Sequence, residues 1–275
     1  MDANRIIPAF VIIDTLMEHL DHQSDPRAQV PDSAIVTVAV VAAKYCANHH
    51  ERAVQVMHGS GSVSGRISVA RFNRRLHALS AWLAFLAVTV GERCTPGEVF
   101  GIDSIPVPVC RRARARRWRK VRGRASCGSC SAKKEKFFGW RLHLICPPHG
   151  VPVTFQLVPG GLHDLTPIHQ LAFALPEGAR LCGDTADTAA DDEQTIQAET
   201  GVRLIPVRKA TMVPHAWFLD ELEVREYRHT IETVTSQLEQ MGVERLRART
   251  NASLELKVHA SLIALVCTNF NEQSR

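Results

Sequence analysis

The stretch 180–187 limits the possible folds most strongly, because it carries an acid where a strand is expected to end. A short apolar run, 181–182, closes on Gly183, and Asp184 follows directly. Carboxylates at the ends of strands are frequent catalytic positions in open α/β sheets. The same pattern is also an ordinary way to end a strand. The interpretation of Asp184 therefore depends on whether other acids accompany it.

Two further acids occupy comparable positions. Asp103 lies inside a short apolar run, 101–105, and Glu232 lies on a strongly periodic segment near the C-terminus. Three carboxylates, on two strands and one helix, supply the oxygen donors that a divalent-metal site needs. The sequence therefore predicts a metal site formed by Asp103, Asp184 and Glu232.

The segment around Glu232 has the pattern of a long amphipathic helix, from about 219 to 241. Its apolar residues recur at helical spacing and predict a stripe that packs on a sheet. They are Val224, Tyr227, Ile231, Val234, Leu238 and Met241. Glu232 is one residue past Ile231, so it lies about 100° round the helix, at the edge of this stripe. It either reaches towards the two aspartates or forms a surface pair with Arg228, four residues earlier.

Positive charge is concentrated between Arg111 and Lys136. This segment holds twelve Lys or Arg against the single Glu135, a net of +11, while the whole chain carries +5, so the remainder sums to −6. Such a segment favours a polyanionic partner, because bound phosphates release counterions and relieve the self-repulsion. The alternative is a solvated loop without a partner.

Residues 1–98 are predicted to be helical throughout. One helix follows the flexible stretch 58–65, with Ser68 as its N-cap. Its apolar face is formed by Val69, Phe72, Leu76 and Leu79. Arg71, Arg74 and Arg75 lie largely on other faces. This helix is either a helix-turn-helix-like DNA reader or a bundle helix with a solvated basic face.

From residue 99 the pattern changes to strands. Segment 99–109 is strand-like, although Pro106 and Pro108 indicate that it ends there or lies at an edge. Segments 138–146 and 151–157 alternate and predict an antiparallel pair. Helices and strands then alternate up to the long helix. The predicted architecture is a mixed α/β sheet with flanking helices over 99–275, preceded by an all-helical region over 1–98.

The overall composition fits a folded cytoplasmic protein. The chain has 275 residues, 45% of them apolar, and no apolar stretch reaches the roughly 18 residues of a membrane span. Its eight cysteines are scattered, which is typical of reduced thiols rather than a disulfide framework. Only Cys127 and Cys130 have metal-ligand spacing, with Cys110 and His143 as distant candidates, so a zinc site remains an open alternative.

Taken together, these motifs resemble an insertion-sequence transposase of the DDE type, with an RNase H-like catalytic core. The resemblance spans about 101–270, with a weaker match at 71–77. The residues that carry it are Asp103 to Cys110, Phe138 to His143, Pro159 to Asp164, Gly183-Asp184 and Tyr227 to Glu232. The resemblance implies that Asp103, Asp184 and Glu232 match the family's metal-binding triad.

The expected chemistry is phosphoryl transfer on DNA with two Mg²⁺ ions, for which Mn²⁺ can substitute. Asp103 is expected to bridge the ions, with Asp184 on one and Glu232 on the other. His163 and Asp164 either support this site or, for Asp164, cap the following helix. The residues expected to contact DNA are Arg71, Arg74, Arg75, Arg111, Arg112, Arg114, Arg116, Arg117, Arg119, Lys120, Arg122, Arg124, Lys133, Lys134, Arg208, Lys209 and Arg228.

The resemblance further implies cleavage at terminal inverted repeats, strand transfer into target DNA and a homodimer on DNA, in a bacterial, nucleoid-associated protein with no membrane partner. Three positions depart from the family pattern, namely Asp187, Thr230 and Glu239. Two alternatives therefore stay open. One is a decayed copy that binds DNA without catalysis, and the other is a metal-dependent DNA nuclease that lacks strand transfer.

Overall fold

The computed structural model describes residues 3–63, 65–92, 97–111, 126–130, 133–183, 190–207 and 218–273. The chain forms two compact units. The first joins Met1–Val90 with Gln237–Arg275, and the second is Gly91–Ser236. In these described ranges no helix is both long enough and apolar enough to span a membrane.

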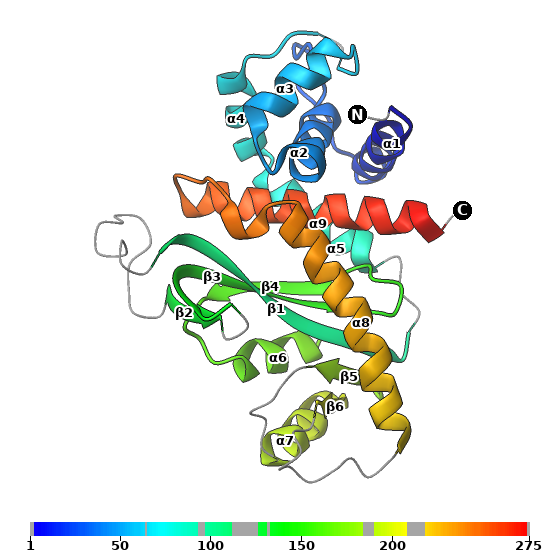
Figure 1. Ribbon diagram of the computed structural model, residues 1–275. Helices are drawn as coiled ribbons and strands as arrows, with labels where there is room; N and C mark the ends of the chain where they lie inside the picture. The colour runs from blue at the N-terminus through cyan, green and yellow to red at the C-terminus, as the bar shows by residue number, and fades with distance from the viewer. Residues whose placement is uncertain are drawn as a thin grey trace. The chain divides into compact units, whose positions relative to one another are not determined.

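The first unit is built from helices, as predicted for the N-terminal region (Figure 1). Its elements are α1 (Ala3–His19), α2 (Asp32–Cys46), α3 (His50–Gly59), α4 (Val69–Ala78), most of α5 (Ser80–Glu92), the short 3₁₀ helix Val243–Arg245 and α9 (Asn251–Gln273). Ser68 caps α4 as predicted, because its side chain accepts a hydrogen bond from the backbone N–H of Arg71 at 3.3 Å.

The C-terminal helix α9 is tied to the turn between α2 and α3. The side-chain amide of Asn48 donates to the carbonyl of Met241 and to the hydroxyl of Ser261, at 3.2 and 3.0 Å. Lys257 Nζ donates to the carbonyls of Asn48 and Arg247, at 3.0 and 2.8 Å. These bonds explain why 237–275 groups with the N-terminal helices, whereas the sequence placed it with the sheet. The assignment of 1–98 to DNA binding stays a prediction.

The second unit is organised around a mixed sheet of six strands (Figure 1). Along the main path the strands run in the order β2-β3-β1-β5-β6, and β4 pairs with β3. The strands are β1 (Val99–Arg111), β2 (Cys127–Cys130), β3 (Glu135–Cys146), β4 (Thr154–Pro159), β5 (Arg180–Gly183) and β6 (Arg203–Pro206). Pairing is antiparallel among β1 to β4 and parallel from β1 through β5 to β6. The predicted mixed α/β sheet is therefore confirmed.

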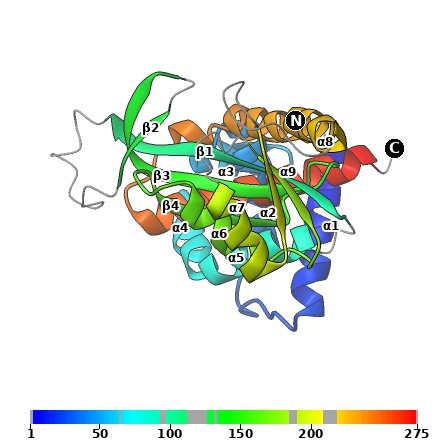
Figure 2. The same cartoon turned by 90° about the horizontal axis from the view of Figure 1, so that it is seen from below.

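Helices cover both faces of this sheet. On one face α6 (Leu165–Ala172) and α7 (Ala190–Thr200) pack over a cluster that includes Phe100, Leu181 and Leu204 (Figures 1 and 2). On the other face lies α8 (Phe218–Gln240), whose Val224 contacts a cluster with Val99, Cys182 and Ile205. Because side chains alternate along a strand, consecutive residues of β1 point to these two different faces.

The first half of β1 lies inside the sheet and the second half at an edge. Among the described residues, parallel pairing with β5 covers Val99 to Ile102, while β3 pairs with β1 from Gly101 to Arg111. Proline lacks the N–H that a central strand must donate on both sides. Among the described strands, the half that holds Pro106 and Pro108 pairs with β3 alone, so their predicted edge position is confirmed.

The predicted antiparallel pair is formed by β3 and β4, in register from Trp140 opposite Pro159 to Ile145 opposite Thr154. The short strand β2 pairs with the start of β3 and contains both Cys127 and Cys130. Residues three apart in a strand point to opposite faces. These two thiols therefore cannot chelate one ion while β2 is extended, which argues against a zinc site at this pair.

Candidate active site

Two of the three predicted acids line the same pocket. It lies between the start of β1, the end of β5 and the middle of α8, and its lining includes Asp103, Gly183, Arg228 and Glu232. The two carboxylates are far apart in sequence, and the sheet and α8 bring them together. The stripe on α8 holds the helix against β1, where a side chain at Gly101 would meet Cβ of Ile231 and the carbonyl of Tyr227, each at 3.5 Å.

The carboxylate of Asp103 is oriented by two hydrogen bonds. Its Oδ1 accepts the backbone N–H of Ser104 at 2.7 Å, and its Oδ2 accepts the hydroxyl of Thr235 at 2.8 Å. Thr235 lies on α8, so this second bond joins the strand to the helix. These two bonds fix the direction of the carboxylate within the pocket.

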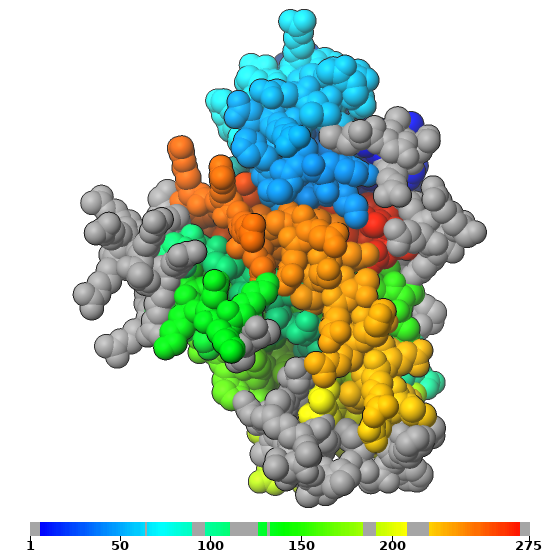
Figure 3. Space-filling view, in the orientation of Figure 1, coloured from blue at the N-terminus to red at the C-terminus, as the bar shows by residue number. Residues whose placement is uncertain are grey.

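Glu232 forms an ion pair with Arg228, whose Nε lies 2.8 Å from Oε1 of Glu232. The pair that the surface interpretation expects is therefore present, and both side chains are partly exposed, 60% for Glu232 and 50% for Arg228. In the space-filling view α8 is the yellow-to-orange ridge at the surface (Figure 3). Glu232 thus combines the expected surface pair with a position in the same pocket as Asp103.

The pocket offers oxygen donors and no thiolate. Cys182 lines it, but burial raises the pKa of this thiol to about 12, with a further contribution from Glu223. Burial and the charge of Asp103 raise the pKa of the nearby Cys146 well above its ordinary value. A cysteine binds a metal ion as its thiolate, not as the neutral thiol. The chemistry of the donor set therefore suits a hard cation such as Mg²⁺ rather than zinc.

Several predicted functional residues lie outside the described part of the chain. Asp184 is one of them. It directly follows Gly183, which is the last residue of β5 and lines the pocket. Among the described residues no group of three or more His, Cys, Asp or Glu is placed to hold a metal, and the described part of the predicted triad consists of two carboxylates. Also outside the described ranges are Asp187, Arg112, Arg114, Arg116, Arg117, Arg119, Lys120, Arg122, Arg124, Arg208 and Lys209.

Comparison with known families bears directly on this site. A family model described as transposase DDE domain matches residues 93–251, more than half of the chain, and the match includes Asp103, Asp184 and Glu232. The chain belongs to the DDE transposases. No curated protein and no solved structure matches it. The resemblance stated from the sequence is therefore confirmed at the level of the family.

Asp164, which was predicted either to support the triad or to cap the following helix, does not line the pocket of Asp103 and Glu232. It occupies the N-cap position of α6, but its side chain makes no capping hydrogen bond, so the capping interpretation is wrong. Its Oδ1 lies 3.5 Å from Arg141 and 3.7 Å from the buried His143. His143 is opposite Ser104, one residue along from Asp103. Asp164, Arg141 and His143 therefore lie on the face of the sheet that α6 covers, across the sheet from the Asp103 carboxylate.

The arginines of helix α4 differ in their contacts and their exposure. Arg75 donates to the carbonyl of Val30 at 2.6 Å and pairs with Asp32, which joins α4 to the start of α2. Arg71 and Arg74 are exposed. Lys133 and Lys134 are exposed in the turn between β2 and β3, and Arg111 ends β1. Arg71 and Arg74 are thus better placed than Arg75 to contact a partner.

Two features of the structure were not predicted from the sequence, namely the contact of Thr235 with Asp103 and a cluster of arginines near the start of α9. Thr235 lies three residues after Glu232, a helical spacing that would have placed it on the same flank. The alternating run of Arg245, Arg247 and Arg249 lies beside Lys257 in a separate pocket. The alternation itself was a visible signal in the sequence, but only the fold shows that it opens into a cavity.

Proposed function

We propose that this chain is the transposase of a bacterial insertion sequence, which cuts DNA at terminal inverted repeats and joins the 3′ ends to target DNA. One observation carries the proposal. Asp103 on β1 and Glu232 on α8, which are far apart in the sequence, line one pocket. Gly183, the residue that directly precedes Asp184, lines it too. We further propose that the sheet unit has an RNase H-like fold, in agreement with its mixed sheet and flanking helices.

In this proposal Asp103, Asp184 and Glu232 are the catalytic and metal-binding triad. These residues would hold Mg²⁺ ions, with Asp103 as the shared ligand and Asp184 and Glu232 as ligands of one ion each, and Mn²⁺ could replace Mg²⁺. The oxygen donors of the pocket and the neutral thiol of Cys182 fit this group of metals. Bound ions would activate the attacking oxygen and neutralise charge that builds on the phosphate during in-line displacement.

The chain's own residues contribute orientation and charge. Thr235 and the N–H of Ser104 hold the Asp103 carboxylate in one direction, so that little reorganisation is needed on binding. Arg228 is the one cationic side chain among the described residues that line the pocket. It is placed to contact a scissile phosphate and, through its pair with Glu232, to keep that carboxylate at the pocket edge.

DNA is the proposed partner. The protein binds it as a homodimer that holds two DNA ends together. The segment 111–136, Arg208, Lys209 and the exposed Arg71 and Arg74 would contact phosphates, and such contacts position DNA without reading its sequence. The expected location is the cytoplasm, in association with the nucleoid.

The test is a reaction on supercoiled plasmid carrying two copies of the element's ends, with Mg²⁺ or Mn²⁺. The proposal predicts cleavage at the ends and joined strand-transfer products, both dependent on the metal and on the presence of paired ends. Cleavage without any requirement for paired ends, and without joined products, would indicate the nuclease alternative. Binding without cleavage under any metal condition would indicate the decayed copy.

A further inference from the structure

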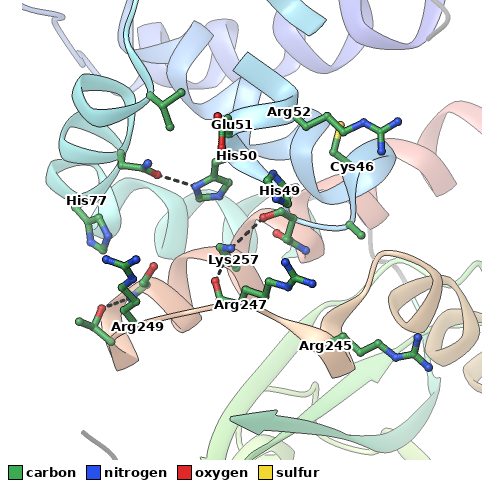
Figure 4. A pocket seen from close by; sticks show the side chains of 16 residues that line it. Cys46, His49, His50, Glu51, Arg52, His77, Arg245, Arg247, Arg249 and Lys257 are labelled. Atoms are coloured by element: carbon green, nitrogen blue, oxygen red, sulfur yellow. Dashed lines mark hydrogen bonds between the residues drawn. The ribbon is translucent and has the colours of Figure 1, made fainter. Parts of the chain in front are cut away.

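The strongest unassigned feature is a large basic pocket in the helical unit. Its volume is about 960 Å³, and it lies between the α2–α3 turn, α4 and the segment leading into α9 (Figure 4). Five cationic side chains line it, against the single carboxylate of Glu51. They are Arg52, Arg245, Arg247, Arg249 and Lys257. The pocket therefore carries a net charge of about +4 before any of its histidines is protonated.

These arginines are not neutralised within the described structure. Arg75 and Arg27 each pair with an aspartate. By contrast, within the described ranges no carboxylate lies within ion-pair distance of the guanidinium groups of Arg52, Arg245, Arg247 or Arg249. Like charges gathered on one concave surface repel one another. An anionic ligand would relieve this repulsion.

Backbone groups add to the positive potential. The pocket contains the first residue of α3, His50, and the start of α9, where Thr250 accepts the N–H of Ser253 at 3.1 Å. The N-terminus of a helix carries a partial positive charge and presents unpaired N–H groups. Two helices of 10 and 23 residues therefore begin at the same basic pocket.

The segment that carries three of the arginines is held in a defined position. Lys257 is buried, with 7% exposure, and its ammonium donates to the carbonyls of Asn48 and Arg247. Figure 4 shows these bonds as dashed lines from Lys257. Lys257 thus anchors the arginine segment to the α2–α3 turn. The arginines are presented by a fixed backbone rather than by a free loop.

The arrangement of the charges indicates the class of ligand. In the view of Figure 4, Arg249 and His77 are at one end, and Arg52 and Arg245 are at the other. Charges spread along a cavity suit a chain of phosphates better than a single small anion, because successive phosphates of a strand can each meet a cation.

We propose that this pocket binds the phosphodiester backbone of DNA, as a contact separate from the pocket of Asp103 and Glu232. The inference rests on the proposed action on DNA. Contacts of this kind are independent of base sequence, so they would hold either the element's end or flanking DNA in register. Arg247 and Arg249 are the positions to test, because Lys257 holds the backbone carbonyl of Arg247 and Arg249 directly precedes Thr250 at the start of α9.

The test compares two full-length double variants that each remove two positive charges. R247Q/R249Q changes the pocket. R27Q/R225Q is the charge-matched control, because Arg27 and Arg225 are exposed side chains paired with Asp25 and Glu221. Affinity for duplex DNA is measured by fluorescence anisotropy over a range of salt concentrations, after thermal melting has shown that each variant is folded.

We expect R247Q/R249Q to reduce the slope of log affinity against log salt by about 2, and to weaken binding equally for different sequences. The control should keep nearly the wild-type slope. Equal slopes in the two variants would overturn the inference. A thermal stabilisation by inorganic phosphate that R247Q/R249Q abolishes, with an unchanged DNA slope, would also overturn it in favour of a small anion.

The outcome is separable from that of the proposed function. If wild type cuts plasmid but the two variants bind DNA alike, the pocket inference fails and the transposase proposal stands. In another outcome, wild type binds DNA but never cuts it, and R247Q/R249Q has a smaller slope of log affinity against log salt than wild type. The proposal of catalysis then fails and the pocket inference stands.

Discussion

At the scale of single residues, the direction of the Asp103 carboxylate depends on the hydroxyl of Thr235. Removing it in Thr235→Val keeps the side-chain shape but breaks the 2.8 Å bond to Oδ2. Loss of a group that orients a metal ligand typically costs about 10–100-fold in metal affinity or activity. We expect plasmid nicking to fall by about this factor, and the Mn²⁺ concentration for half-maximal rate to rise.

The matched control is Thr233→Val on the same helix. Its hydroxyl is exposed and donates to the carbonyl of His229, not to the pocket. This variant should keep the wild-type metal dependence. If both variants show the same metal dependence, Thr235 does not position Asp103.

Part of the site could be predicted from sequence at this scale. Asp103 and Glu232 were identified because each is an acid at a recognisable place in a strand or helix pattern. Thr235 was missed because a hydroxyl on a helix flank is common, and only the approach of α8 to β1 gives it a partner. The capping role of Asp164 was wrong because the guanidinium of Arg141 on β3 offers the carboxylate a charged partner.

At the scale of elements, the close approach of β1 and β3 depends on Gly139. A Cβ at this position would lie 2.5 Å from the carbonyl of Val107 and 2.7 Å from the N of Val109. Backbone atoms cannot yield as a flexible side chain can. We expect Gly139→Ala to lower the free energy of unfolding by about 1–3 kcal/mol, measured by urea denaturation.

The comparison variant is Gly59→Ala, at the end of α3, where no heavy atom lies within 4 Å of the added Cβ. It should leave stability unchanged or raise it by up to about 1 kcal/mol. An equal loss in both variants would show that the tight contact at Gly139 has no special cost.

The elements with a clear period were predictable. The β3–β4 pair follows from alternation, and α8 follows from its apolar stripe, whose Val224, Ile231 and Val234 are buried. The strand β2 was not predicted, because four residues with two small side chains carry too little pattern. Its place beside β3 is set by close packing, since a side chain at Gly128 would collide with Gly160 and Phe137.

At the scale of the whole molecule, buried histidines make the fold sensitive to acid. Burial lowers the pKa of His50, His143 and His259 from 6.5 to about 4. Above pH 6.5 they are neutral in both states and contribute nothing. As the pH falls from 6.5 to 4, only the unfolded chain gains these protons, so stability is lost. Each histidine contributes a loss of about 3 kcal/mol at most.

We therefore expect the free energy of unfolding to decrease over this pH range and the contribution of the histidines to level off below about pH 4. Urea denaturation at several pH values measures it. His143→Gln should flatten the dependence, whereas His163→Gln, at an exposed position, should not. The same pH dependence in both variants would contradict the account.

The grouping of α9 with the N-terminal helices could not be predicted from local pattern. Its buried positions, such as Leu254, Val258 and Ile263, would suit either a sheet or a helical partner. In the fold α9 packs against α2, and long-range bonds such as those of Asn48 to Met241 and Ser261 join the two segments. No periodicity in the sequence records such bonds.

The measurement that tests the central claim most directly is metal-dependent nicking of supercoiled plasmid carrying the flanking ends. Wild type is compared with D103N, D184N and E232Q, and with E226Q as a control at an exposed position on the same helix. The account predicts that wild type and E226Q nick the plasmid with Mg²⁺ or Mn²⁺. Each triad variant should be slower by at least about a hundredfold, more than the loss of an orienting group. Nicking by all five proteins at similar rates would contradict the assignment of the triad.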